Sequence, residues 1–173
     1  METIPDTAPA ETGATSPEKA DLGKRFLALL IDGLIVMALS FILGMAGRTF
    51  SGLGLLIGAA YILLRDGLAL EFMNGRSIGK KVMKLRPIRL DGGIMDINTS
   101  IRRNWPLVLG SIIMGIASVS FGIGMFAIAA LLGVIGWIAS LLGLVEAILV
   151  LTDSEGRRIG DKFAGTKVIV SDD

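Results

Sequence analysis

The longest uncharged run constrains this chain more than any other feature. From Trp105 to Val145 there are 41 consecutive residues without a charge, and only Glu146 interrupts the run before Asp153. As one helix, residues 105–151 would be about 70 Å long, roughly twice the thickness of a bilayer. The run must therefore fold back on itself, and the small residues and glycines at 118–124 favour a turn there.

Composition indicates the class of protein. Of 173 residues, 52% are hydrophobic and 19% charged, so the chain could not cover its apolar surface and remain soluble. A run of 22 apolar residues from Phe26 to Gly47 is interrupted only by Asp32, and 16 uncharged residues follow from Thr49 to Leu64. We predict an all-α integral membrane protein, a four-helix transmembrane bundle with a small cytoplasmic β-hairpin cap. The expected helices are 25–47, 50–71, 105–122 and 126–151.

The second of these helices reaches bilayer length only if it continues through Arg65 and Asp66. If it stops at Leu64, those two residues lie at the membrane interface. Residues 1–22 contain Pro, Thr, Glu, Ala and Ser and little that could be buried, so they are predicted to be a disordered cytoplasmic tail without the features of a secretory signal. Residues 23–171 are predicted to be one membrane domain.

Basic residues are distributed unevenly. Lysines and arginines concentrate in the 73–104 loop and near the C-terminus, whereas Arg48 is the only one in the turns expected on the other side. Positive charge resists translocation, so both termini are expected in the cytoplasm and the protein in a plasma membrane, such as a bacterial inner membrane.

The 73–104 loop has a hairpin signal. Apolar runs at 82–90 and 94–97 flank Asp91-Gly92-Gly93, and residues 166–171 are predicted to add a strand. The alternative is a basic loop that lies on anionic lipid headgroups.

Four ionisable residues interrupt the apolar runs in one layer near the cytoplasmic side: Asp32, Arg65, Asp66 and Glu146. Arg25 lies two helical turns before Asp32. In one interpretation Arg65 neutralises Asp32 or Glu146 and ties helices together. In the other, three carboxylates face one intramembrane arginine, which neutralises only part of their charge, so the remainder must bind a proton or a cation or contact water. The ion-binding candidates are then Asp32, Glu146 and Asp66, with Arg25 and Arg65 as counter-charges.

Small residues predict close helix packing, within one bundle or between copies in a homodimer. Gly54 and Gly58 share a face of the second helix, and Ser40 and Gly44 share a face of the first. The last helix presents a four-member face, formed by Gly133, Gly136, Ser140 and Gly143.

The chain has no cysteine and no histidine, so it offers no disulfide, thiol nucleophile, imidazole base or Cys/His zinc site. We expect no enzyme activity, no metal and no cofactor. The 75–81 segment is one residue short of a phosphate-binding loop, and nothing predicts nucleic acid as a partner.

Several segments together resemble the RDD family of membrane proteins. They are Leu-Gly-Lys-Arg-Phe-Leu-Ala-Leu-Leu-Ile-Asp at 22–32, Gly-Arg-Ser-Ile-Gly-Lys-Lys at 75–81, and Asp-Lys-Phe-Ala-Gly-Thr-Lys-Val at 161–168. The resemblance assigns the family motif to Arg25, Asp32, Gly79, Lys80, Asp161, Gly165 and Thr166. Arg65, Asp66 and Glu146 fall outside that pattern. On the predicted topology Asp161 lies outside the bilayer, where we expect it to form a salt bridge or a turn cap that holds the C-terminal tail against Arg25 or the basic loop. The alternative is a solvated turn residue.

Two functions are open at this stage. Some members of the family resemble sodium–proton antiporters, which agrees with an acid-rich layer that carries Na⁺ or H⁺. Others resemble regulators or scaffolds of membrane protein complexes, in which the charges are structural and the cytoplasmic cap contacts another membrane protein. The lipid bilayer is the expected partner in both.

Overall fold

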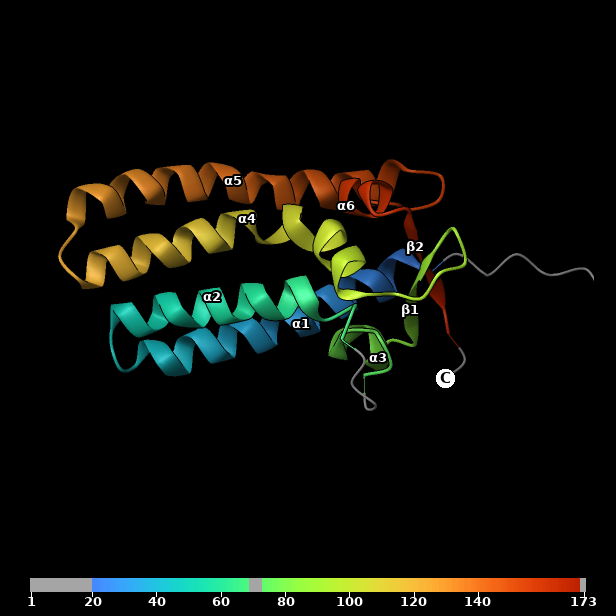
Figure 1. The fold of residues 1–173 in the computed structure, drawn as a ribbon, viewed down its shortest axis with the longest axis horizontal. Helices are drawn as coiled ribbons and strands as arrows, with labels where there is room; N and C mark the ends of the chain where they lie inside the picture. The colour runs from blue at the N-terminus through green and yellow to red at the C-terminus, as the bar shows by residue number, and fades with distance from the viewer. Residues whose placement is uncertain (1–19, 69–72, 172–173) are drawn as a thin grey trace, which may run out of the picture.

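The computed structural model describes residues 20–68 and 73–171. Four long helices lie side by side: α1 (Leu22–Gly44), α2 (Arg48–Leu64), α4 (Ile97–Gly122) and α5 (Phe126–Thr152). Short turns join them in pairs at one end of the molecule (Figure 1). The opposite end carries what we call the cap, which consists of α3 (Ile78–Val82), β1 (Leu85–Arg89), α6 (Ile159–Phe163) and β2 (Thr166–Val170). The predicted tail at 1–19 lies outside the described residues, whereas Ala20 is buried against the cap and Leu22 already begins α1.

Three of the helices, α1, α4 and α5, are long and apolar enough to cross a membrane. Helix α2 is apolar but has 17 residues, a rise of about 25 Å. The structure therefore agrees with a mostly helical membrane protein, while the count of four spans stays a prediction. The distribution of side chains fits lipid surroundings, because Phe41 and Trp137 are 71% and 67% exposed whereas Arg65 and Arg103 are among the largest fully buried side chains.

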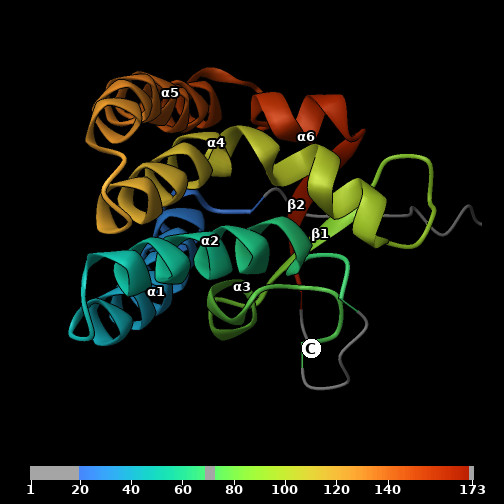
Figure 2. The same cartoon turned by 60° about the vertical axis from the view of Figure 1, so that its left-hand side comes forward.

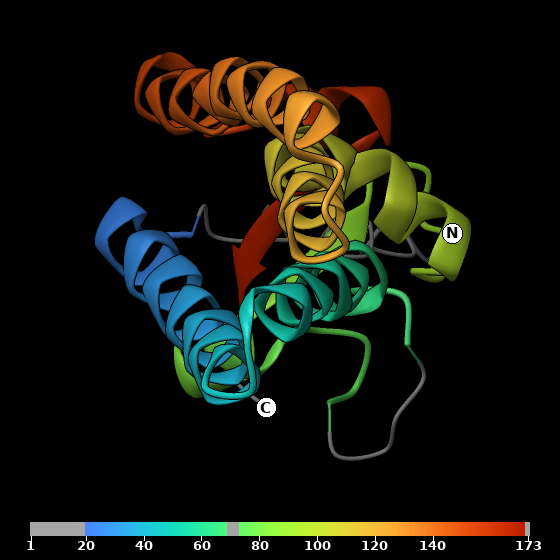
Figure 3. The ribbon, with the colours of Figure 1, turned by 90° about the vertical axis from the view of Figure 1, so that its left-hand side faces the viewer.

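The long helices form an open row. Helix α1 packs on α2, α2 on α4, and α4 on α5, which leaves α1 and α5 apart at the two ends of the row (Figure 3). Closely packed glycines hold the row together: a Cβ on Gly54 would lie 2.7 Å from the Ser40 Cα, and one on Gly52 would lie 2.7 Å from the Gly115 carbonyl oxygen.

The expected four-member glycine face of α5 is only half correct. Gly136 and Ser140 pack against Met114 and Gly110 of α4. Gly133 and Gly143 have open space where a side chain would be, with nothing within 4 Å. Residues spaced along one helix face contact a neighbour only where the neighbour runs beside them, and α4 covers only part of this face.

Helix α1 begins and ends three residues earlier than predicted, and two further predicted boundaries are wrong by more than that. Helix α2 ends at Leu64 and Arg65 is its C-cap, so Arg65 and Asp66 lie in the turn that follows. Helix α4 begins eight residues before the predicted start, because the Asp96 side chain accepts a hydrogen bond from the Thr99 backbone N–H and caps a first segment that carries Arg103. Pro106 lies inside α4, where a proline removes one helical hydrogen bond and favours a bend. Figure 1 shows that α4 is not straight along its length.

The predicted hairpin does not form. Strand β1 pairs antiparallel with β2, from Leu85 opposite Val170 to Arg89 opposite Thr166, and residues 94–97 form no strand. The Leu90 N–H donates to the Gly165 carbonyl, which continues this pairing away from 94–97. The turn at Asp91 exists, with the Gly93 N–H donating to its carboxylate at 3.0 Å. A local turn signal therefore correctly marked a turn but could not reveal a strand partner far along the chain.

The cap contains an internal repeat. Helix α3 with β1 and helix α6 with β2 have the same lengths and the same spacing, and each strand follows a residue with positive φ, Lys84 (54°) or Gly165 (61°). Because Pro87 pairs with Val168 at the middle of both strands, the two units are related by a local twofold axis. Figure 2 shows α3 near α1 and α6 near α4, on opposite sides of the strands.

A glycine at the start of each short helix makes this docking possible. Gly79 lies against the Ala28 carbonyl of α1, and Gly160 lies against the Arg103 carbonyl of α4, so closely that a Cβ at either position would overlap the carbonyl oxygen. Each glycine N–H donates to a carboxylate on a long helix, Asp32 at 2.9 Å or Glu146 at 3.0 Å. The cap is therefore attached at two equivalent points.

We predict that Gly160→Ala lowers the free energy of unfolding in detergent by about 1–3 kcal/mol, because the added methyl group must push α6 away from backbone atoms that cannot rotate aside. The measurement is thermal or denaturant unfolding followed by circular dichroism. Gly133→Ala is the matched control, since its Cβ meets open space and alanine is the better helix former. Equal stabilities of the two variants would contradict the proposed close docking.

Candidate functional site

A cluster of buried charges lies where the long helices meet the cap. Within the described residues, four carboxylates and five basic side chains form it, and we call this set the charged cluster: Asp32, Asp66, Glu146, Asp161, Arg25, Arg65, Lys80, Arg103 and Arg158. All except Arg25 are buried residues, and the Arg25 side chain is 9% exposed. Charges at this depth need partners, because an unpaired buried charge is strongly destabilising.

Asp161 pairs with more basic side chains than any other carboxylate of the charged cluster. Its carboxylate lies 2.8 Å from the Arg103 Nε, 3.2 Å from the Arg25 Nη2 and 3.5 Å from the Arg158 Nε. The expected ion pair between Asp161 and Arg25 is thus present, and Arg25 also donates to the Gly156 carbonyl. These contacts join α1, α4 and α6.

Electrostatics keep Asp161 ionised. Burial alone would raise the pKa of this carboxyl, but Arg103, Arg158 and Arg25 outweigh burial and hold the pKa well below its ordinary value. Its Oδ2 also accepts a hydrogen bond from the Arg158 backbone N–H at 3.2 Å. Asp161 is therefore a fixed negative charge at neutral pH.

Asp32 is fully satisfied by three donors. The Arg65 Nη1 lies 2.7 Å from its Oδ2, while the Tyr61 hydroxyl and the Gly79 N–H donate to its Oδ1 at 3.0 and 2.9 Å. Because Arg65 follows the end of α2 directly, it reaches back to α1 from the turn. This geometry is the helix-tying ion pair that the sequence offered as one of two interpretations.

Asp66 belongs to the junction with the cap. Its carboxylate lies 2.5 Å from the Lys80 Nζ, accepts from the Asn104 Nδ2 at 3.2 Å and lies 3.7 Å from the Arg103 Nη1. Its backbone N–H donates to the Ser100 Oγ at 3.2 Å, which ties the turn after α2 to the first segment of α4. Asp66 is fully buried, although it lies beyond the helix end rather than within a helix.

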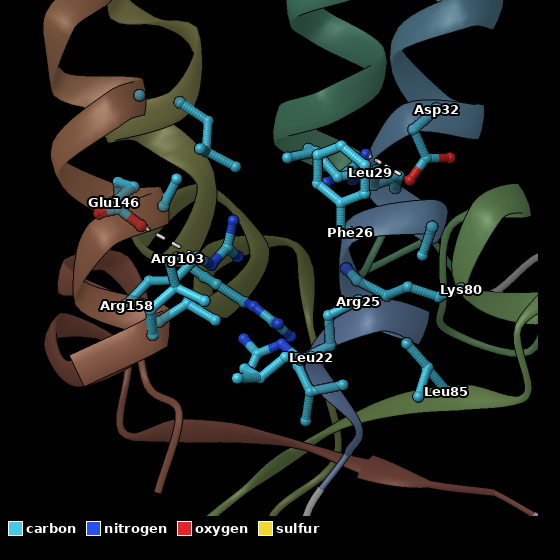
Figure 4. Close-up of a pocket in the computed structure, with 18 residues that line it drawn as sticks. Leu22, Arg25, Phe26, Leu29, Asp32, Lys80, Leu85, Arg103, Glu146 and Arg158 are labelled. Carbon is cyan, nitrogen blue, oxygen red and sulfur yellow. Dashed lines mark hydrogen bonds and ion pairs between the residues drawn. The ribbon is translucent and has the colours of Figure 1, made fainter. Parts of the chain in front are cut away.

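Glu146 differs from the other three carboxylates. Its Oε1 accepts the Gly160 N–H at 3.0 Å, whereas its Oε2 accepts no hydrogen bond from the described residues and lies 3.7 Å from the Arg158 Nε. Asp32 and Glu146 therefore belong to different ion pairs. Figure 4 shows them on opposite sides of a cavity.

The charge balance of the cluster is opposite to the one expected. The sequence placed three carboxylates against one intramembrane arginine, whereas the structure sets five bases against four acids. The additional bases Lys80, Arg103 and Arg158 come from the cap and the first turns of α4, so counting charges within apolar runs could not find them. Of these, Lys80 was identified only as a family-motif position.

The cluster lines a cavity of about 310 Å³ between α1 and α5. Seven charged side chains reach it: Arg25, Asp32, Arg65, Lys80, Arg103, Glu146 and Arg158. Apolar side chains from the facing helices form its other walls, among them Phe26, Leu29, Val150 and Leu151. Within residues 20–68 and 73–171, no group of three or more acidic side chains is placed to hold a metal ion.

The model of the RDD family matches residues 19–165, most of the chain. The chain belongs to the RDD family. No curated protein and no solved structure matches it. In this RDD protein the motif residues meet at one place, since Arg25 pairs with Asp161, Gly79 binds Asp32, and the buried Thr166 hydroxyl lies 3.4 Å from the Asp161 carbonyl. Lys80 pairs with Asp66, so a residue outside the family pattern completes the same network.

Removal of the Asp161 charge tests the importance of the cluster. We predict that Asp161→Asn lowers the free energy of unfolding by about 3–5 kcal/mol, because three arginines lose their common counter-charge in a buried site. Asp91→Asn is the control, since it removes an exposed ion pair with Arg89 and should cost at most about 1 kcal/mol. Denaturant unfolding in detergent would measure both, and a loss for Asp161→Asn no larger than the control would refute the central role of this carboxylate.

Proposed function

We propose that this RDD protein is a non-transporting scaffold or regulator of a membrane protein complex, in which the charged cluster attaches the cap rigidly to the helices. The supporting observation is that each buried carboxylate of the cluster is paired with a base from another element or from the cap. Ion pairs between separate elements hold those elements in one arrangement.

The sign of the charge supports this choice over cation transport. A site that exchanges Na⁺ or H⁺ needs a carboxylate that fixed positive charge does not already hold, so that it is free for the ion. Here five bases surround four acids, and Asp32 accepts three donors at 2.7–3.0 Å. A cation would have to displace Arg65 to reach this carboxylate.

The loop after β1 is the proposed contact surface for a partner. Ile94 is 89% exposed, and its neighbours Leu90 and Ile97 are 48% and 47% exposed. The segment that carries them follows β1 and lies at the cap end of the molecule, away from the turns that join the long helices (Figure 1). Apolar groups exposed next to charged ones are typical of protein contact sites.

The cap is proposed to face the cytosol. The basis is the concentration of lysine and arginine in the cap and its loops, against Arg48 as the basic residue near the opposite turns. In the chain, which lacks cysteine, labelling of an introduced Ile94→Cys by an impermeant maleimide added outside intact cells would contradict this orientation.

We predict that affinity purification of the full chain in mild detergent recovers a membrane protein partner in stoichiometric amount, and that Ile94→Asp reduces its recovery at least about tenfold, because it places a charge in an apolar contact. Asn98→Asp is the matched control, since it adds the same charge at an exposed position nearby in the first turn of α4. Recovery of the chain alone, or equal loss in both variants, would count against the scaffold.

A second candidate, proton-coupled cation transport, is favoured by one observation. Glu146 is buried and lines the cavity, and its Oε2 has no hydrogen-bond donor among the described residues. That oxygen could carry a proton. The candidate proton site is therefore Glu146 rather than Asp32, and it would work without a cluster of acids.

Proteoliposomes separate the two candidates. On the scaffold proposal, vesicles containing the protein show no sodium-dependent proton flux above protein-free vesicles, measured with an internal pH-sensitive dye. A flux that Glu146→Gln removes, while Asp91→Asn leaves it unchanged, would establish transport and overturn the scaffold as the primary function.

A further inference from the structure

The cavity between α1 and α5 opens to the side of the molecule. These helices lie at the two ends of the row and do not pack side by side as the other neighbours do (Figure 3). Phe26 and Leu151, which line the cavity, are 64% and 67% exposed, so its mouth is apolar. A groove between two apolar helices is open to a molecule that arrives within the lipid layer.

The inner end of this cavity is strongly basic. Five of the seven charged residues that line it are cations, and they come from α1, the turn after α2, α3, α4 and the start of α6. Asp66 and Asp161, which are not among the residues that line the cavity, neutralise part of this charge. Within the described cluster, one positive charge remains in excess.

Arg103 keeps a donor that its two carboxylate partners, Asp66 and Asp161, do not use. Its side chain is 0% exposed and lines the cavity, and its Nη2 finds no hydrogen-bond acceptor among the described residues. The Nε of Arg65, also buried at the cavity, lacks an acceptor as well. A buried guanidinium donor without an acceptor is costly, and an anion placed in the cavity would satisfy it.

From these observations we propose that the cavity binds one anionic phospholipid, with the phosphodiester at Arg103 and an acyl chain in the groove between α1 and α5. Charge decides the headgroup, because a single negative charge balances the excess of the cluster. The apolar walls favour a lipid over a free inorganic anion, because Phe26, Leu29 and Val150 offer contacts to an acyl chain that an inorganic anion would not use. The inference stands apart from the scaffold and the transport candidates.

Gly143 allows a test that leaves the charges untouched. It lines the cavity and has nothing within 4 Å of the position of a Cβ, so a leucine there would fill the groove. Gly133 lies on the same helix with equally open surroundings but is not among the residues that line the cavity. Gly143→Leu and Gly133→Leu are therefore a matched pair of the same substitution.

The experiment uses the full chain in detergent, titrated with palmitoyl-oleoyl phosphatidylglycerol or phosphatidylcholine and read by native mass spectrometry and thermal unfolding. We expect one phosphatidylglycerol per chain, bound about tenfold more tightly than phosphatidylcholine. Both lipids offer a phosphodiester to Arg103, but the positive choline group cancels the headgroup charge and is repelled by the excess positive charge of the cluster. The preference and the rise in unfolding temperature should disappear in Gly143→Leu and remain in Gly133→Leu. Ala147→Phe, at an exposed position that lines the same cavity, provides a second blocking variant if the first does not fold.

Three results would overturn the proposal. They are equal binding of both lipids, equal lipid preference in the two leucine variants, and stabilisation by inorganic phosphate that matches that of phosphatidylglycerol. The last would show that a free anion is sufficient and that the apolar groove contributes nothing.

Discussion

The contact between Asp161 and its arginines is the interaction on which the rest of the structure depends. Three guanidinium groups from α1, α4 and the start of α6 meet one carboxylate that is fully buried. Such groups can be buried together only if each finds a partner, so the elements that carry them must be positioned accordingly. The location of α6, and through it β2 and the paired strand β1, follows from this requirement.

The polarity of the molecule is reversed relative to a soluble protein. Its largest buried side chains include Arg65, Arg103 and Glu146, while large apolar side chains such as Trp137 face outward. In lipid the outer face gains nothing from burial against another helix, so close glycine contacts and ion pairs provide the association instead. The long helices are therefore apolar on the outside because they face lipid, and they are held together by glycine contacts along their length and by ion pairs at one end.

Local signals were sufficient for some features and not for others. The uncharged run and the glycines near 122 predicted α5 to within one residue, and Arg25 was one of the two partners expected for Asp161. The end of α2 was missed because Leu68 and the apolar residues that follow it imitate a continuing helix. The pairing of β1 with β2 and the additional basic residues of the charged cluster were missed. Both involve contacts between segments that are far apart in the chain, and a short stretch of sequence carries no signal of such contacts.

The repeat in the cap extends to the long helices. Two identical short chains, each with a pair of long helices followed by α3 and β1, would form the same antiparallel strand pair across a true twofold axis. The present chain has the architecture of such a dimer in one polypeptide, since α1 with α2 and α4 with α5 precede equivalent units. A twofold axis would make the contact of α2 with α4 equivalent to one of α5 with α1. Only the first pair is closely packed, and the second pair lines the cavity, so the symmetry ends where the chain could admit another molecule.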